Sequence, residues 1–366
     1  MPSLDTVTPS GRLVIAIAAA LVAATGALDA AGAPKVATFF VAALGLAALA
    51  EVFGEAMEQV GKRIGPGPTG LLQSSLGNLP ELLFAIFALR AGLNSVVQAA
   101  LIGSVLANVL LVLGLAFLGG GMRHGTQTFA PEGPRMLVTL LTLAAGAALV
   151  PTLAAKLGAA GHHTAALSDA AAVILLVVYL ASIPFWLSGG PQPAVARAPA
   201  EGAPRSAPTA AKPLWPLGLA IVLLAAASVG SGAVSQWFVS ALVPATKSLG
   251  ISTAFTGLVI VALASNAVEN IAGVRFAWKA RPDYAISTIL NSPLQITLFL
   301  MPVLVLASSF IGPEHLTFVF PPLLVAALAV AVVVVAVVVY DGEYSWLEGV
   351  ALLALYAVIA AAFWWG

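Results

Sequence analysis

The sequence has no cysteine and few charged residues. Lys, Arg, Asp and Glu make up 8% of its 366 residues, whereas soluble domains carry about 25%. So few charged side chains cannot cover a water-facing surface, which excludes a soluble enzyme and a disordered chain. Fifteen basic residues balance fifteen acidic ones, so no basic excess is available for binding a nucleic acid. Without cysteine the chain has no disulfide and no soft-metal site, and any metal must be held by oxygen atoms.

Signatures of two kinds of hydrolase are also missing. The chain contains no Walker A sequence and no His-Glu-x-x-His motif. We therefore expect neither an ATP-driven pump nor any other enzyme, and no bound cofactor.

Long apolar runs fill the chain instead. A membrane-spanning helix needs about 20 mostly apolar residues. Breaks at Gly, Pro and charged residues predict an all-α polytopic membrane protein with about eleven such helices, at 13–29, 36–61, 68–90, 93–118, 135–155, 165–187, 214–245, 252–279, 283–310, 317–339 and 344–365.

One stretch, 188–213, interrupts this pattern because it is rich in Pro and Ala and carries several charges. Such a composition favours a flexible linker. We therefore divide the chain into an N-terminal anchor helix (1–33), a first repeat (34–187), a cytoplasmic linker (188–213) and a second repeat (214–366). The first helix also fits a cleavable signal peptide, although we favour a retained anchor.

The basic residues indicate an orientation. With the N-terminus inside, eleven of the fifteen Lys and Arg residues lie on the cytoplasmic side and four outside. Cytoplasmic loops of membrane proteins carry such an excess. The N-terminus and linker are therefore predicted to be cytoplasmic, and an odd number of spans places the C-terminus outside.

Two segments in opposite halves are alike. Residues 77–81 (Gly-Asn-Leu-Pro-Glu) and 265–269 (Ser-Asn-Ala-Val-Glu) share Asn and Glu at an offset of 188 residues. The two predicted spans that contain them run in opposite directions across the membrane. Inverted repeats of this kind are typical of secondary transporters.

Each segment places an amide and a carboxylate on one helix face. Asn78 and Glu81 are spaced i, i+3, as are Asn266 and Glu269. A charge at the bilayer centre costs about 2.5–3.5 kcal/mol, and neither helix offers a Lys or Arg at that level. A divalent cation or protons must therefore neutralise the pair, which titrates as a coupled unit and suits an exchanger. The alternative is two protonated residues that only pack, which leaves the duplication unexplained.

Neighbouring spans offer more oxygen atoms. Ser104 and Asn108 share one helix face, and Ser292 and Gln295 share another. These residues can serve helix packing or complete the six to eight oxygens that calcium takes. Gln98 lies off the first of these faces, and the sequence leaves its role in an ion or proton path open.

A second acidic feature lies in the span 36–61. Glu51, Glu55 and Glu58 follow i, i+4, i+7 spacing and form one stripe. We interpret the stripe as a cation vestibule or proton path. Glu58 can equally form a surface pair with Lys62, four residues further along.

The segments 77–90 (GNLPELLFAIFALR) and 96–114 (VVQAALIGSVLANVLLVLG) resemble the first repeat of calcium/proton antiporters, a branch of the calcium/cation antiporter superfamily of sodium/calcium exchanger-like proteins. Residues 265–302 resemble the second repeat. This resemblance implies two inverted five-helix bundles with a peripheral first helix, in the plasma (inner) membrane of a prokaryote. It implies that Ca²⁺ leaves the cytoplasm in exchange for H⁺ as the helices 36–61 and 214–245 slide.

The resemblance also assigns roles to residues. It implies cation binding by Glu81 and Glu269, by the asparagines beside them, and by the neighbouring Ser104, Asn108, Ser292 and Gln295. It matches Glu58 to an acidic residue of the family's second helix.

Four positions depart from the family pattern. Ser265 replaces Gly, Asn270 replaces His, Asn291 replaces the Gly before Ser292, and Gln236 stands where an acidic residue is expected. These departures keep Na⁺/H⁺ or Na⁺/Ca²⁺ exchange open as alternatives, and also a sensor that binds ions without moving them. The sequence does not decide whether the chain forms a homo-oligomer.

Overall fold

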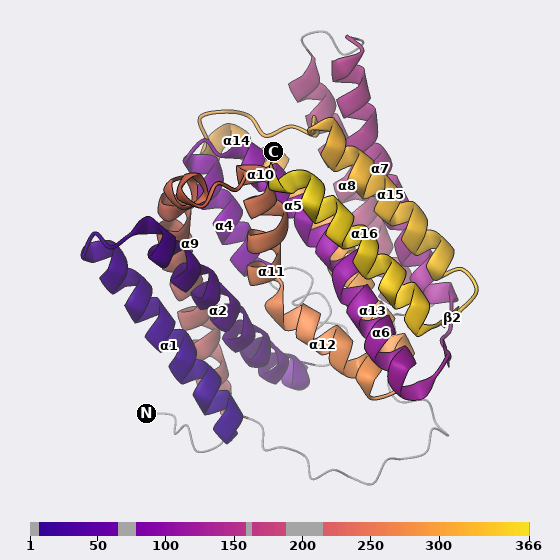
Figure 1. Ribbon diagram of the computed structural model, residues 1–366, viewed down its shortest axis with the longest axis horizontal. Coiled ribbons are helices and arrows are strands. Elements are labelled where there is room, and N and C mark those ends of the chain that lie inside the picture. Colours follow the sequence, from indigo (N-terminus) through magenta and orange to yellow (C-terminus); the bar gives the residue numbers. More distant parts are fainter. Residues whose placement is uncertain (1–6, 65–77, 159–162, 188–214, 366) are drawn as a thin grey trace.

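The computed structural model describes residues 7–64, 78–158, 163–187 and 215–365. Almost all regular structure in these ranges is helical (Figure 1). The exception is a pair of two-residue strands, β1 (Gln127–Thr128) and β2 (Glu343–Tyr344), which pair antiparallel and join two loops.

Among the described residues, the first half contains five separate helices and one that includes a π-helical turn. The separate ones are α1 (Pro9–Ala30), α2 (Lys35–Ile64), α4 (Leu79–Arg90), α7 (Glu132–Lys156) and α8 (Thr164–Leu187). The remaining one runs from α5 (Asn94–Leu106) through a π-helical turn, η2 (Ala107–Val112), into α6 (Leu113–His124).

The second half contains more interruptions. Its segments are α9 (Leu217–Leu249), α10 (Thr253–Phe255), η4 (Thr256–Val261), α11 (Ala262–Ser265), α12 (Ala267–Trp278), α13 (Pro282–Gln295), η5 (Ile296–Leu300), α14 (Met301–Ile311), α15 (Pro322–Val338) and α16 (Trp346–Trp364). Both η4 and η5 are π-helical.

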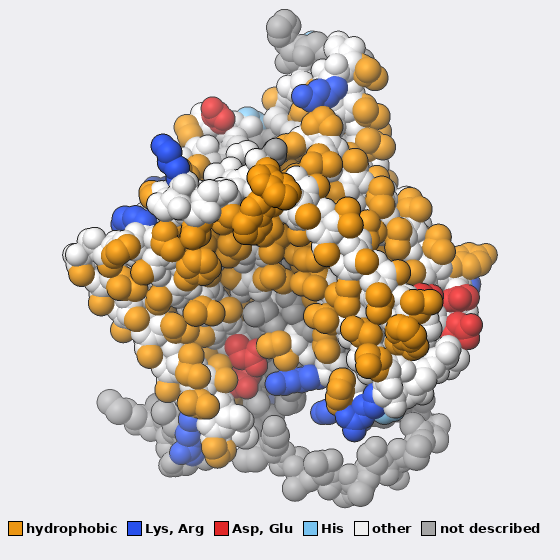
Figure 2. Space-filling view, viewed as in Figure 1, with side chains coloured by type: hydrophobic (Ala, Val, Ile, Leu, Met, Phe, Trp, Pro, Cys, Tyr) orange, Lys and Arg blue, Asp and Glu red, His pale blue; other side chains and the backbone are white. Residues whose placement is uncertain are grey.

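In the described ranges, eight helices are long and apolar enough to cross a membrane, namely α1, α2, α5–α6, α7, α8, α9, α13–α14 and α16. Large apolar side chains on several of them face outward, and they cover the middle of the face shown in Figure 2. The chain is therefore an all-helical, multi-pass membrane protein.

Three of the eleven predicted spans are not single long helices. The run 68–90 contains α4, and its first part lies outside the described residues. The run 252–279 is broken at Asn266, between α11 and α12. The run 317–339 contains α15, which has 17 residues. The linker 188–213 lies outside the described residues.

One predicted boundary is wrong. We expected a helix to end at residue 118, before three glycines, but α6 continues to His124. Glycine is needed at these positions because neighbouring groups occupy the space beside them. A Cβ on Gly120 would lie 2.6 Å from the Tyr344 hydroxyl, and one on Gly121 would lie 2.5 Å from the Trp346 nitrogen.

Helix α5 forms the centre of the molecule, since every residue from Val96 to Leu106 is buried. It crosses η4 at Gly103, where an added Cβ would lie 2.3 Å from the backbone oxygen of Leu258. Glycine is therefore required for this close approach. At the edge, α2 packs against α9, and α1 covers both from outside (Figure 1).

Candidate ion-binding site

The two halves keep the same register throughout their central elements. An offset of 188 residues relates the first and last residues of α4 to those of α12, the start of α5 to that of α13, and the start of α6 to that of α14. The π-helical turns η2 and η5 begin within one residue of the same relation. π-helical turns are rare and often mark functional sites, so their repetition indicates a duplicated site.

Asn78 and Asn266 occupy equivalent places at the starts of α4 and α12. Their backbone angles are nearly the same, with φ −95° and ψ 20° for Asn78 and φ −107° and ψ 17° for Asn266. Neither pair of angles is helical, so each asparagine marks the point where a short helix begins. Both side chains are buried.

Glu81 lies in the first turn of α4 and is only 2% exposed. Two features offset the cost of burying its carboxyl group. The positive end of the α4 dipole is within one turn, and the Ser104 hydroxyl donates a hydrogen bond to Glu81 Oε1 at 2.5 Å. A bond this short is typical of a hydroxyl that donates to a carboxylate.

The hydrogen bonds around Ser104 have a defined direction. Asn266 Nδ2 donates to the Ala262 carbonyl at 3.1 Å, and a carbonyl can only accept, so this atom is the amide nitrogen. The same nitrogen donates to Ser104 Oγ at 2.9 Å. The Ser104 proton is therefore directed toward Glu81, and one chain of donors runs from Asn266 to the carboxyl group.

Each asparagine forms a hydrogen bond with a residue of the opposite half. Asn266 of the second half contacts Ser104 of the first, and Asn78 of the first half donates to Gln295 Oε1 of the second at 3.3 Å. The structure thus brings together the predicted residues Asn78, Glu81, Ser104, Asn266 and Gln295.

Two further predicted residues supply buried oxygen atoms. Asn108 donates from Nδ2 to the Ser104 carbonyl at 2.9 Å. Its Oδ1 atom, like the Ser292 hydroxyl, is buried without a hydrogen-bond partner within the described part of the chain. An unpartnered buried oxygen is costly, and a bound cation would relieve that cost.

Other predicted residues are only partly placed or lie elsewhere. The backbones of Glu269 and Glu58 belong to α12 and α2, but their side chains lie outside what the structure describes. Glu51 and Glu55 are half-buried on α2, and Glu55 Oε2 faces Gly11 at the start of α1. The Gln98 amide donates to two backbone carbonyls of the loop before α15, those of Thr317 and Val319, both at 3.0 Å.

Sequence reasoning missed three buried hydroxyl groups. Ser231 and Ser235 lie one turn apart on α9, and Thr288 lies one turn before Ser292 on α13. All three hydroxyls are buried without a hydrogen-bond partner in the described ranges. The signal that could have found them is i, i+4 spacing of small polar residues in an apolar helix.

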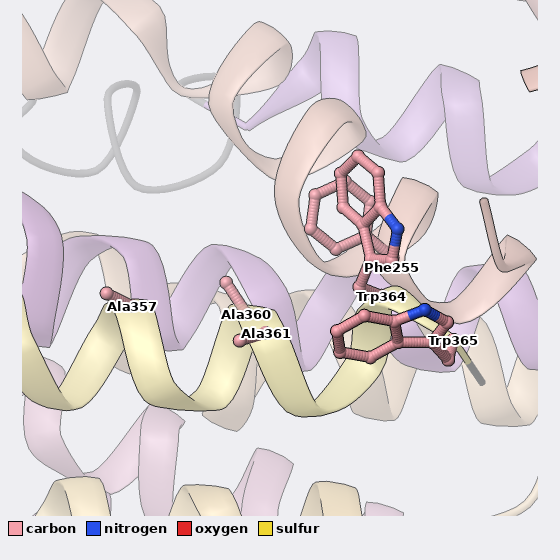
Figure 3. A pocket seen from close by; sticks show the side chains of 6 residues that line it. All are labelled: Phe255, Ala357, Ala360, Ala361, Trp364 and Trp365. Carbon is pink, nitrogen blue, oxygen red and sulfur yellow. The ribbon is translucent and has the colours of Figure 1, made fainter.

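Two surface hollows lie apart from these buried groups. One, of about 410 Å³, is lined only by apolar residues, which are Phe255, Ala357, Ala360, Ala361, Trp364 and Trp365 (Figure 3). The other, of about 400 Å³, lies between α4 and α9 and is lined by Phe87, Arg90, Ala91, Gln236, Val239 and Ser240. The first lacks oxygen ligands, and the second offers an arginine, which repels a cation.

Comparison with known proteins gives matches over most of the chain. Residues 35–187 and 219–365 match the sodium/calcium exchanger protein family. A Ca²⁺/H⁺ antiporter of Synechocystis sp. is 36% identical over 343 residues, which cover 89% of this chain and 90% of that protein. One of Aphanothece halophytica is 34% identical over 341 residues, or 90% of each chain.

The fold is also shared with a solved structure. The structure of native YfkE superposes with a TM-score of 0.81 at 30% identity and covers 96% of this chain and 99% of the other. The duplicated register, the equivalent non-helical asparagines before α4 and α12, and these matches lead to one conclusion. The chain belongs to the sodium/calcium exchanger protein family of cation exchangers.

Proposed function

We propose that this protein is a secondary active antiporter that exports Ca²⁺ from the cytoplasm in exchange for H⁺. The observation that carries the proposal is the buried Glu81 carboxyl group, which Ser104 connects to Asn266 of the other half. The names of the Synechocystis and Aphanothece relatives support this choice of ions.

The proposed site combines the two glutamates with the amide and hydroxyl oxygens around them. Glu81 and Glu269 supply the charge, and the additional ligands are drawn from Asn78, Asn266, Ser104, Asn108, Ser292 and Gln295. Hard oxygen ligands of this kind suit Ca²⁺. Two carboxylates balance either one divalent cation or two protons. The buried site therefore has a similar net charge whichever of them is bound.

Ser104 provides a physical basis for the exchange of Ca²⁺ and protons at Glu81. Its hydroxyl donates to Glu81 Oε1 while it accepts from Asn266. A cation that takes Glu81 as a ligand competes with this hydroxyl for the same carboxyl group. Protonation of the glutamates removes the charge that holds the cation, and the cation leaves.

We further propose the membrane arrangement that this function needs. Eleven spans form an anchor helix (1–33) and two inverted five-helix repeats (34–187 and 214–366), joined by a cytoplasmic linker in the plasma membrane of a prokaryote. The N-terminus is then cytoplasmic and the C-terminus outside. The contact of α2 with α9 supports their movement as a pair that alternates access.

The test is Ca²⁺ uptake into inverted vesicles or proteoliposomes driven by a proton gradient. Glu81→Gln should reduce uptake to the level of empty vesicles, because the neutral amide cannot balance the cation. Glu314→Gln, the same change on an exposed loop residue, should leave uptake unchanged. Unchanged uptake in Glu81→Gln would overturn the site.

Competition separates the alternatives. Excess Na⁺, K⁺ or Mn²⁺ is added during uptake, and the proposal expects Ca²⁺ to be moved in preference. Uptake that requires Na⁺ instead of a proton gradient would indicate sodium exchange. Ca²⁺ binding without any uptake would indicate a sensor.

A further inference from the structure

The ends of α6 and α12 meet at one edge of the molecule (Figure 1). The guanidinium of Arg123, in the last turn of α6, lies 5.1 Å from the centre of the Trp278 ring, at the end of α12. Arg275, Lys279 and Arg281 lie within a few residues of Trp278, and all are exposed. We call Arg123, Arg275, Lys279 and Arg281, with Trp278, the basic end patch. Figure 2 shows blue side chains gathered at this edge.

No acidic residue neutralises the patch within the described ranges. None of its four cations forms an ion pair there. The nearest acid along the chain, Asp283, instead accepts a hydrogen bond from the Ala130 nitrogen at 2.8 Å. Glu132 lies in the first turn of α7 and also forms no ion pair. Among the described side chains, the four positive charges thus have no acidic partner that would compete with an outside anion.

The backbone holds these cations in a fixed turn. Ala280, between Lys279 and Arg281, has φ 54°. In the described part of the chain, no other non-glycine residue has a positive φ. The equivalent residue of the first half, 188 positions earlier, is Gly92 with φ 72°. An L-residue in this conformation costs about 1 kcal/mol. The turn is nevertheless kept, with nitrogen–carbonyl hydrogen bonds from Ala280 to Ala277 and from Arg281 to Phe276.

The charges are not part of the duplicated framework. At the same offset, the four basic positions correspond to Phe87, Ala91, Leu93 and Ile311, all uncharged. The turn itself is duplicated, but four basic residues gather at the second-half turn, whereas Arg90 is the basic residue in the last turn of α4. The duplicated framework therefore does not by itself require the cluster.

Exposed apolar side chains beside the patch indicate the kind of anion. Trp278 is 51% exposed and Met122, beside Arg123, is 72% exposed. Half-exposed tryptophans at the ends of spanning helices are typical of the membrane–water interface. A cluster of four or more Lys and Arg residues at this level is typical of sites for anionic lipids, whose phosphate oxygens accept charge-assisted hydrogen bonds from arginine.

We propose that the basic end patch binds the phosphate headgroup of an anionic phospholipid from the adjoining leaflet. The exposed Trp278 and Met122 favour a lipid over free phosphate, since an acyl chain covers apolar surface and an inorganic ion does not. The site lies at one end of α12, and Asn266 stands at the other end. A lipid bound here thus contacts the helix that begins at Asn266 of the buried polar centre.

The test measures lipid binding directly and does not depend on transport. Purified full-length protein is titrated with phosphatidylglycerol or phosphatidylcholine, and bound lipid is counted by native mass spectrometry. Each basic residue near a membrane contributes about 5-fold to the affinity for anionic lipid. The triple variant Arg123→Gln, Lys279→Gln, Arg281→Gln should therefore bind phosphatidylglycerol about 100-fold more weakly and phosphatidylcholine as before.

The control is a variant in which three exposed basic residues at the ends of other helices are replaced. Arg90, Lys156 and Lys247 lie in the last turns of α4, α7 and α9 and are exposed. Their joint change to Gln should leave phosphatidylglycerol binding within about 5-fold of the unchanged protein, which is one residue's contribution. Equal losses in the two triple variants would overturn the proposal, because the effect would then follow net charge alone.

A second measurement locates the bound lipid and distinguishes lipid binding from binding of free phosphate. Brominated phosphatidylglycerol should quench more fluorescence in the unchanged protein than in Trp278→Phe, and brominated phosphatidylcholine should show no such difference. Inorganic phosphate at millimolar concentration should not displace the lipid. Displacement by phosphate, or quenching that does not depend on Trp278, would overturn a phospholipid site at this patch.

Discussion

At the scale of single residues, the Ser104 hydroxyl is the group on which the buried centre depends. It accepts from Asn266 and donates to Glu81 within one small volume, so it serves both halves at once. Its own exposure is 0%, which means that no water can take over either hydrogen bond without a rearrangement.

We predict that Ser104→Ala weakens both the fold and transport. The change removes the hydroxyl that donates to the buried Glu81 carboxyl group and accepts from Asn266, and loss of such a buried hydrogen bond costs about 1–3 kcal/mol. Thermal unfolding in detergent should show a lower Tm, and proton-driven Ca²⁺ uptake should fall. Ser104→Thr keeps the hydroxyl and should restore most of the uptake. Equal Tm and uptake in Ser104→Ala and the unchanged protein would contradict this role.

Tyr344 shows the opposite situation, a buried polar group that nothing satisfies. Its ring stacks on Phe117 with centroids 4.0 Å apart and an angle of 3°, and its hydroxyl has no hydrogen-bond partner among the described residues. Burial raises the pKa of Tyr344 from 10.0 to about 12. The ring therefore stabilises the loop beside α6, and the hydroxyl does not.

We predict that Tyr344→Phe is as stable as the unchanged protein at neutral pH, or more stable, and that its advantage grows in alkali. The unfolded tyrosine ionises above pH 10, whereas the folded one ionises near 12. The contribution of Tyr344 to the free energy of unfolding is therefore complete below pH 10 and is lost as the pH rises toward 12. Tm values at pH 7, 9 and 11 test this, and a Tm difference that shrinks from pH 9 to 11 would refute it.

At the scale of helices and turns, the crossing of α5 and η4 brings the two halves into backbone contact. Gly103 precedes Ser104, and its hydrogen faces the Leu258 backbone. In the second half Asn291 precedes Ser292 and is half-buried. The departure from the family pattern at Asn291 thus gives the second half a side chain where Gly103 of the first half has none.

We predict that Gly103→Ala destabilises the protein by at least the 1–3 kcal/mol typical of an overpacked core. The added Cβ would lie 2.3 Å from a backbone oxygen and 2.4 Å from the Leu258 Cα, and neither atom can turn away. Gly146→Ala is the matched control, because nothing lies within 4 Å of its Cβ position on α7. Tm should fall for the first variant and stay level or rise for the second.

Hydropathy predicts long apolar helices well, because a continuous apolar run inside a membrane must satisfy its backbone hydrogen bonds within a helix. It fails where a neighbour decides the outcome. The glycines before His124 look like a helix end, yet α6 continues through them, and Tyr344 and Trp346 leave no room there for larger residues. Hydropathy likewise predicts one span over 252–279, whereas the structure breaks it at Asn266. The hydroxyls of Ser231 and Ser235 went unnoticed because serine is common in packed membrane helices.

At the scale of the whole molecule, the charge distribution sets the orientation. We predict that the C-terminus lies outside and the linker 188–213 inside. Alkaline phosphatase, active only outside the cytoplasm, should be active when fused after residue 366 and inactive when fused at residue 200. A fluorescent protein that folds only in the cytoplasm should give the reverse result. Activity of the same reporter at both positions would contradict an odd number of spans.

The members of the buried centre were predictable, but their pairing was not. Spacing singles out Asn78, Glu81, Asn266 and Gln295 because polar groups are rare and costly in apolar helices. It does not show that each asparagine reaches across to the opposite half. That exchange depends on how α5 and α13 pass each other in three dimensions.

This exchange has a consequence for biogenesis. The ribosome delivers the first half to the membrane before the second exists, and during that interval Asn78 and Ser104 have no partners from residues 266 and 295. The newly inserted half must therefore hold water, or a chaperone, around its polar groups until synthesis is complete. A protein built in this way is vulnerable to quality control midway through its own translation, and two separately expressed halves would need to meet soon after insertion to escape degradation.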